Sequence, residues 1–296
     1  QFFKILILYT ALTFLIFIIL KLINLRTFDS FNLSMTIISS GGFLPVNNID
    51  SIINTNLKEI GMSFLMLFSF FSLYLIYNII FLKDKSLNFF AEDIYLFIYF
   101  IILIIIFFVL FNFNYNFSSI LFSLTSSMSN IGISLKDTPS NLWLLYLIIV
   151  IIGGSFFSTS SGLRLLKIYF LFRHSINEIL SYSKPNNVYT NKFHLIESNV
   201  EQKDINKYFL SVLIFIISLF LITLLFTIFN INFDEAFKLG ILTLMNTVNS
   251  SMYDLSNFNF IDLNAQSKLV MIVFMIIGRV ELLTLLIIAK KFLFKN

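Results

Sequence analysis

The sequence predicts an all-α membrane protein built from three successive repeats of long helix, short helix, polar turn and long helix. Hydrophobic residues make up 58% of the 296 positions and charged residues only 12%, whereas a soluble domain carries about 25% charged residues. Several apolar segments reach the roughly 20 residues that a helix needs to cross the hydrocarbon core. Between them, shorter segments ending in Ser-, Gly- and Asn-rich turns recur in the same order.

The long apolar segments predict spanning helices over residues 2–23, 60–82, 93–111, 141–170, 206–229 and 267–290. The shorter segments, each a predicted amphipathic helix followed by a turn, cover residues 28–45, 116–135 and 233–252. The chain therefore divides into four parts: 1–82 with the first turn, 83–180 with the second turn and a broken outer helix, 181–204 as a polar linker, and 205–296 with the third turn. Non-helical backbone at membrane depth is tolerated only inside protein or beside a water-filled cavity. Three such turns in register predict a shared polar axis.

Basic residues give the orientation of the repeats. Most Lys and Arg residues fall on the side opposite the three turns, and loops rich in Lys and Arg face the cytoplasm. The turns then open outward, and residues 181–204 lie in the cytoplasm, as either a solvated linker or a surface for a partner. The chain begins with Gln1 and has no signal-peptide pattern, so we expect its true N-terminus to be missing.

Composition argues against an enzyme. Cysteine is absent, and His174 and His194 are the only histidines, which disfavours zinc, haem and iron–sulfur ligation. A membrane-bound enzyme would need a cluster of His, Cys or paired acids at membrane depth, and the sequence offers none there. We therefore predict no enzymatic activity and no cofactor in this chain, and expect the lipid bilayer rather than nucleic acid as its surroundings.

The first two turns have features of a cation filter. They read Ser39-Ser40-Gly41-Gly42-Phe43 and Ser129-Asn130-Ile131-Gly132-Ile133-Ser134. Backbone carbonyls can replace the water shell of an ion, glycine allows the required turn, and the C-terminal end of the preceding short helix favours a cation. A glycine in a membrane turn more often serves packing, but these two fall at the same place in successive repeats. The predicted cation filter comprises Ser40, Gly41, Gly42, Asn130, Ile131, Gly132, Val248, Asn249, Ser250 and Ser251.

The third turn, residues 246–252, contains no glycine. Asn and Ser tolerate tight turns, so a loop is still expected. A symmetric ring of carbonyls is not.

The outer helix of the second repeat is interrupted by residues 153–162, which are rich in Gly, Ser and Thr. Residues 141–152 span about 18 Å as a helix, so the break falls near mid-membrane. We interpret it as a movable gate; the alternative is a helix kinked for close packing. The predicted gate residues are Gly153, Gly154, Ser155, Ser158, Thr159, Gly162 and Arg279.

Arg279 and Glu281 lie within the last apolar segment. A lone Arg at mid-membrane is costly, and positions two apart do not share a helix face. Each therefore needs another partner. Arg279 would act as a positive barrier or a tether for the gate, unless it forms a structural ion pair between helices.

These motifs resemble the membrane subunit of the Trk/Ktr potassium transporters. Residues 40–43 resemble the second filter of that family, and residues 130–133 the third. Residues 153–164 look like its intramembrane gate loop, with Ser161 replacing a Gly and Arg164 at a Lys position, and residues 277–281 are similar to its Gly-Arg-x-Glu. The family has four repeats with one filter glycine each, so the resemblance implies that the first repeat is missing. It matches Ser251, or else Asn249, to the last filter glycine.

The resemblance implies potassium uptake across the bacterial cytoplasmic membrane by a multi-pass homodimer. It also implies a cytosolic nucleotide-binding regulatory subunit, docked on residues 163–178 and 181–204. The alternative is a non-conducting or weakly selective, sodium-tolerant scaffold or regulatory subunit derived from the same family, which the glycine-free third turn favours.

Overall fold

The computed structural model describes residues 2–46, 49–73, 91–111, 115–136, 138, 141–182, 202–255, 258 and 260–279, and these form helices and turns without strands. The first repeat contains α1 (Phe2–Leu22), α2 (Thr27–Ser39), η1 (Ile49–Ser51) and α3 (Asn56–Phe70). The second contains α5 (Ala91–Leu110), α6 (Phe117–Met128), α7 (Trp143–Ile152) and α8 (Leu165–Ser181). The third contains α9 (Gln202–Ile228), α10 (Phe233–Leu244), η3 (Ser251–Tyr253), η4 (Phe260–Asp262) and α11 (Ala265–Arg279). The predicted all-α class and its repeat order are confirmed.

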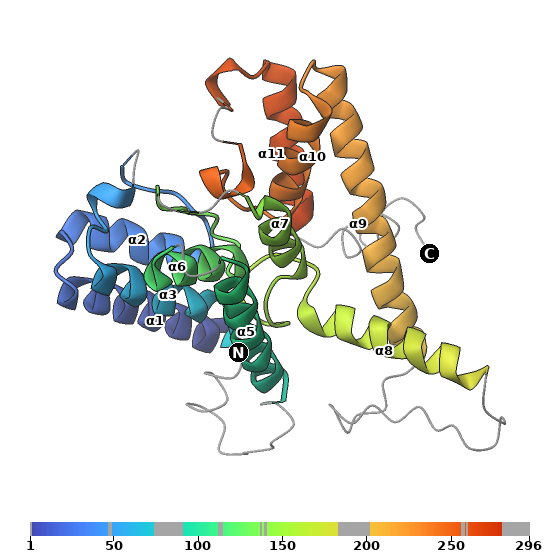
Figure 1. Cartoon of the computed structure of the whole chain (residues 1–296), viewed down its shortest axis with the longest axis horizontal. Helices are drawn as coiled ribbons and strands as arrows, with labels where there is room; N and C mark the ends of the chain where they lie inside the picture. The colour runs from blue at the N-terminus through green and yellow to red at the C-terminus, as the bar shows by residue number, and fades with distance from the viewer. Residues whose placement is uncertain are drawn as a thin grey trace.

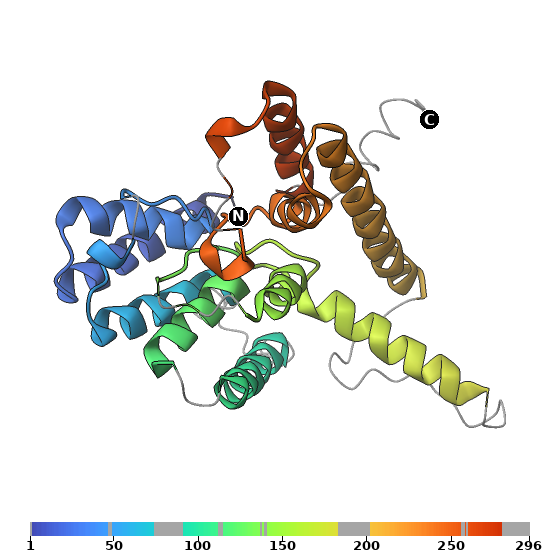
Figure 2. The same ribbon diagram turned by 45° about the horizontal axis from the view of Figure 1, so that its top comes forward.

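The three repeats surround a central region. Figure 1 shows α1–α3 on one side, α5–α7 at the centre and α9–α11 above them, with α8 running outward from the base. In Figure 2 the turns that follow α2, α6 and α10 lie between the three groups of helices. Segments from the whole length of the chain therefore meet in the middle of the molecule.

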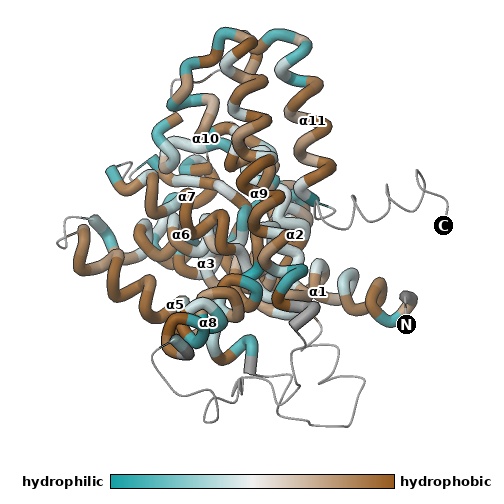
Figure 3. Tube along the Cα trace, turned by 90° about the vertical axis from the view of Figure 1, so that its right-hand side faces the viewer, coloured by the Kyte–Doolittle hydropathy of each residue, from teal (hydrophilic) through white to brown (hydrophobic). Residues whose placement is uncertain are grey.

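Three helices in the described part are long and apolar enough to cross a membrane: Phe3–Leu22 in α1, Glu92–Leu110 in α5 and Ile205–Ile228 in α9. They expose large apolar side chains, including Phe14, Phe97 and Phe220. Figure 3 shows hydrophobic colour along these helices and hydrophilic colour gathered at loops and helix ends. A helix that is apolar on all sides is stable when lipid or protein surrounds it, so these surfaces are lipid-facing.

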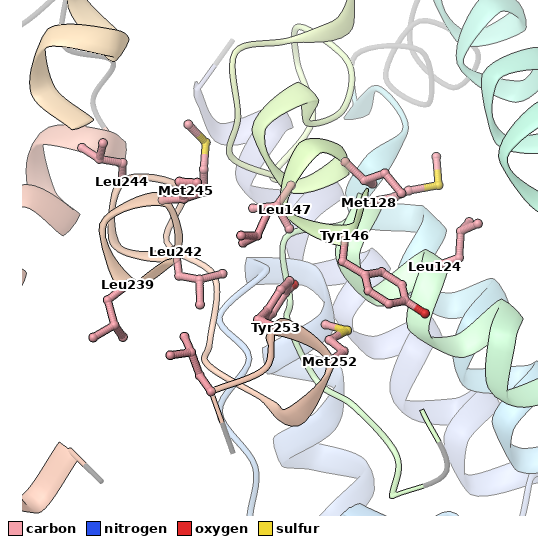
Figure 4. Close-up of a cluster of buried hydrophobic side chains, with 14 of the residues drawn as sticks. Leu124, Met128, Tyr146, Leu147, Leu239, Leu242, Leu244, Met245, Met252 and Tyr253 are labelled. Atoms are coloured by element: carbon pink, nitrogen blue, oxygen red, sulfur yellow. The ribbon is translucent and has the colours of Figure 1, made fainter. Parts of the chain in front are cut away.

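The short helices lie inside the molecule. In α6, every residue from Ser118 to Met128 is buried, although half of them carry hydroxyls. The hydroxyls of Ser123, Thr125 and Ser127 donate to carbonyls of their own helix; Thr125 Oγ1, for example, lies 2.9 Å from Leu121 O. Figure 4 shows Tyr253 and Met252 of η3 between α10 and Tyr146 of α7. The region after the third turn is thus part of the core, and both residues are fully buried.

One predicted helix ends early. The apolar run 60–82 predicted a single long helix, but α3 ends at Phe70, and Phe71 is extended with φ −78° and ψ 163°. The carbonyls of Ser69 and Phe70 instead accept hydrogen bonds from Ser160 N and Ser155 N of the predicted gate. This contact competes with the helix, and the sequence carries no sign of it. Residues 74–90, most of the linker 181–204, Glu281 and the rest of the predicted helix 267–290 lie outside the described residues.

Candidate functional site

The three turns share one backbone pattern. Ser40, Asn130 and Asn246 all adopt a left-handed conformation, with φ of 51°, 58° and 52°. The amide of each donates to the carbonyl three residues earlier, and the following amide donates five residues back. The first set is Ser40 N to Ile37 O, Asn130 N to Ser127 O and Asn246 N to Thr243 O, each 3.2 Å. The second set is Gly41 N to Thr36 O at 3.0 Å, Ile131 N to Ser126 O at 3.1 Å and Thr247 N to Leu242 O at 2.9 Å.

This pattern fixes the register of the turns and corrects one prediction. Two residues beyond the left-handed position lie Gly42 (φ 68°), Gly132 (φ 82°) and, in the third turn, Val248. Val248 is absent from the residues with positive φ. Ser251 belongs to η3, three residues further on. The match of Ser251 or Asn249 to the glycine position is therefore wrong, because sequence comparison without a glycine gave no anchor for the register.

In each of the first two repeats, a hydroxyl of the short helix donates a hydrogen bond to a carbonyl of the turn that follows it. Thr36 Oγ1 donates to Phe43 O at 2.5 Å, and Ser126 Oγ donates to Ile133 O at 2.6 Å. The third repeat has Leu242 at this position, which makes no such bond. Sequence reasoning missed both hydroxyls; the recurring spacing of seven residues between hydroxyl and carbonyl is the signal that could have revealed them.

The turns contact one another directly. Val248 N donates to Ile131 O at 3.4 Å. A Cβ added to Gly42 would overlap Ile131 O, and one added to Gly132 would overlap Val248 O. Ser134 Oγ and Ser251 Oγ are 2.8 Å apart. The turns of the first two repeats therefore need glycine for close approach as well as for a positive φ.

Two cavities flank the turns. One of about 540 Å³ is lined by Gly42, Gly132, Val248 and Asp50, together with Asn249, Ser250 and Ser251. The other, also about 540 Å³, is lined by Ser40, Gly41, Val248 and Arg279 with side chains of α10 and α11. Most predicted filter residues thus line one cavity or the other. Asn130 does not: its Nδ2 donates to Val150 O of α7 at 2.9 Å, so its side chain anchors the turn to the outer helix.

The predicted gate is a closed loop. Gly153 has φ 67° and Gly162 φ 101°, and a Cβ on Gly162 would lie 2.6 Å from the Cα of Gly153. Leu163 N donates to Ile151 O at 2.9 Å, across the base of the loop. The interruption is therefore an Ω-type loop whose ends touch, and not the simple kink of the alternative prediction.

Arg164 fixes the inside of this loop. Its Nη1 lies 2.9 Å from Ser155 O, 2.9 Å from Ser158 Oγ and 2.7 Å from Ser160 O. Thr159 Oγ1 reaches out to Ser69 O of α3 at 3.4 Å. Two carbonyls and one hydroxyl of the loop thus surround the single positive charge of Arg164. These contacts hold the loop together as one unit.

Contacts from other elements hold the loop in place. Glu92 at the start of α5 accepts a hydrogen bond from Phe156 N at 2.7 Å, and a Cβ on Gly154 would lie 2.5 Å from Phe70 O at the end of α3. Sequence reasoning did not single out Glu92. An acid at the first turn of an apolar helix was the available signal, but it has a common explanation in the helix dipole.

Arg279 joins the loop to the first turn. Its Nη1 donates to Ser161 Oγ at 3.1 Å, and its Nη2 donates to Ser39 O at 3.1 Å. Gly278 lets α11 cross α10 closely, because a Cβ there would overlap Leu244 O. A small cavity of about 110 Å³ between loop and α11 is lined by Arg164, Arg279 and the loop hydroxyls.

The fold and site define a class: a helical membrane protein in which short helices direct polar turns to a common centre, with a loop in a broken helix beneath them. Residues 135–295, more than half of the chain, match the family TrkH, described as cation transport protein. The chain belongs to this family. The family consists of transport proteins, so the chain is not an enzyme, in agreement with the sequence prediction.

Among solved structures, the chain is similar to the potassium transporter TrkH from Vibrio parahaemolyticus, with a TM-score of 0.83 and 22% sequence identity. The alignment covers 94% of this chain and 62% of that one. At this identity the likeness shows the fold, and the chain spans less than two thirds of the length of that transporter. A search of curated proteins gives no match.

Proposed function

We propose that this chain forms part of the wall of a potassium path across the bacterial cytoplasmic membrane, as a multi-pass protein. The observation that carries the proposal is the shared backbone of the three turns, which begin at Ser40, Asn130 and Asn246 with the same hydrogen bonds. Such turns, placed together inside a membrane, supply carbonyl oxygens at a common centre. The C-terminal ends of α2, α6 and α10 add negative potential at that centre.

Potassium is the substrate that best suits carbonyl ligands on Gly41, Gly42 and Gly132. The similar structure is that of a potassium transporter. The two 540 Å³ cavities on either side of the turns would hold the ion before and after it passes them.

Val248 supports a second candidate, a weakly selective and sodium-tolerant path. Its amide donates to Ile131 O, so one carbonyl of the second turn is hydrogen-bonded to the third turn. A site with an uneven set of carbonyls discriminates less well between cations of different size.

The loop 153–162 would act as the gate. It lies on the side of the turns where Arg279 contacts both Ser161 and Ser39. Opening would break the hydrogen bond that Arg279 donates to the loop and those that Glu92, Ser69 and Phe70 accept from it, each of which contributes about 1 kcal/mol net. Because these bonds are few, the free energy needed to open the loop as one unit would be small.

We also propose that the protein acts as a homodimer with a cytosolic nucleotide-binding subunit, and that the nucleotide binds to that subunit. The segment 163–178 is the expected docking face, because most of it forms α8, which projects from the base of the molecule (Figure 1). Phe172 and Ile179 of this helix are 69% and 68% exposed, which leaves apolar surface for a partner.

Rubidium uptake tests the transport proposal. The full-length protein, expressed with its cytosolic partner in a host without its own potassium uptake, should accumulate rubidium. Gly132→Ala should abolish uptake, because the added Cβ overlaps Val248 O. Gly240→Ala is the matched control, since its Cβ would meet only side-chain atoms of α9, the nearest at 3.1 Å. Folded, membrane-inserted protein that moves no cation would refute transport and favour the scaffold; uptake suppressed by sodium would favour the weakly selective path.

A further inference from the structure

A buried lysine lies in the short helix that leads into the third turn. Lys238 of α10 is 1% exposed, and its Nζ lies 2.7 Å from Asp234 Oδ2 and 2.9 Å from Asp254 Oδ2. The same Nζ lies 4.3 Å from the centroid of the Trp143 ring, at the start of α7. Two carboxylates and an aromatic face offset the desolvation of this ammonium group. The cluster joins three segments: α10, the residue after η3, and α7.

The two carboxylates play different structural parts. Asp234 is on the same helix as Lys238, one turn away, so this pair ties α10 only to itself. Asp254 follows η3 directly, in a left-handed conformation with φ 58°. Its bond to Lys238 ties the return segment of the third turn to the short helix that leads into that turn.

The return segment is in contact with the third turn. Asn249 Nδ2 donates to Leu255 O at 3.4 Å, and Ser251 at the start of η3 pairs with Ser134 of the second turn. Any shift of Asp254 would therefore displace residues 249–251, which line the 540 Å³ cavity that also contains Gly42 and Gly132.

The third repeat alone has this lysine. The common register places Asn32 and Phe122 at the corresponding positions, eight residues before Ser40 and Asn130. Asn32 donates to Phe28 O of its own helix, and Phe122 is fully buried. The third turn also lacks the filter glycine and the hydroxyl that holds each of the other two turns, since Leu242 replaces it. The charged contact thus occurs in the repeat whose turn has the fewest local constraints.

We propose that the Lys238–Asp254 pair is a brace that positions the third turn and thereby sets the discrimination between potassium and sodium. The brace rests on the proposed transport function and adds to it a positioning residue, Lys238, and its anchor, Asp254. Removal of the brace lets residues 249–251 move. The cavity that these residues line together with Gly42 and Gly132 then accepts ions with a wider range of sizes.

Matched carboxylate variants separate the brace from a simple effect of charge. Asp254→Asn and Asp234→Asn each remove one negative charge within 3 Å of the same ammonium, and both side chains are more than half exposed (55% and 65%). We expect Asp254→Asn to lower the ratio of rubidium to sodium uptake about tenfold, equivalent to about 1.4 kcal/mol, while Asp234→Asn leaves it within about twofold. Equal effects of the two variants, or no effect of Asp254→Asn, would overturn the brace. Adding Lys238→Met to Asp254→Asn should then change the ratio little, because the pair acts as a unit.

Trp143 gives a readout that needs no transport. It is the single tryptophan of this sequence. The fluorescence of the Trp143→Phe variant of the full-length protein serves as the background, which is subtracted. In nanodiscs, Asp254→Asn should raise the quenching of Trp143 fluorescence by acrylamide, since the segment after η3 is released from Lys238, whose Nζ lies beside the Trp143 ring, while Asp234→Asn should not. If the wild-type protein transports no cation but this quenching difference appears, the transport proposal fails, whereas the brace between Lys238 and Asp254 is supported. Equal quenching in both variants would show that Asp254 holds nothing in place.

Discussion

Gly42 offers the sharpest test of the shared-turn geometry. Its φ is 68°, and a Cβ would overlap Ile131 O and lie 2.8 Å from the Cβ of Val248. The left-handed conformation costs an alanine roughly 1–2 kcal/mol, and overpacking of a tight site costs about 1–3 kcal/mol. Because Ile131 O is a backbone atom, rotation of a side chain cannot relieve the overlap. Gly42→Ala should therefore disfavour the described turn by about 3 kcal/mol, or roughly 100-fold in population.

Gly41→Ala is the matched control one residue away. Gly41 has no positive φ, and its nearest neighbour would be Ser39 Oγ at 3.0 Å, a side-chain atom that can rotate. Rubidium uptake, normalised to the amount of protein in the membrane, should fall below a tenth of wild type for Gly42→Ala and remain above half for Gly41→Ala. Equal uptake by the two variants would refute the close approach of the first turn to Ile131.

Three further predictions concern the third turn and the gate. Val248→Gly should raise the ratio of rubidium to sodium uptake, since glycine permits the conformation found at the other two turns; an unchanged ratio would show that Val248 does not limit selectivity. Arg279→Gln and Ser161→Ala each weaken the 3.1 Å contact between α11 and the loop, so both should raise the initial uptake rate, Arg279→Gln by more; slower uptake by folded protein would contradict a restraining role. Glu92→Leu removes the acceptor for Phe156 N and should lower the melting temperature by a few degrees, whereas Glu92→Gln keeps an oxygen there and should not; equal melting temperatures would exclude this anchor.

The sequence by itself determined the membrane class, the repeat order and the place of the loop. Lipid as solvent requires helices of a certain length, and the apolar runs have that length. The Gly- and Ser-rich segments at 39–43, 129–134 and 153–162 became turns and a loop because backbone that leaves the helix inside a membrane needs small residues and polar partners. These are local properties, which composition and spacing record.

The register of the third turn needed the tertiary structure. Without a glycine, the residues 246–252 offered several equivalent matches, and only the hydrogen bonds of Asn246 and Thr247 identified Val248. The end of α3 was hidden for a related reason, because the run 60–82 is apolar on both sides of Phe70.

The contacts that organise the site join residues far apart in the chain, such as Arg279 with Ser39 and Glu92 with Phe156. Each of these side chains has several possible partners in the sequence. Packing of the three repeats around one centre decided which partner lies within hydrogen-bond distance, and no local pattern carries that information.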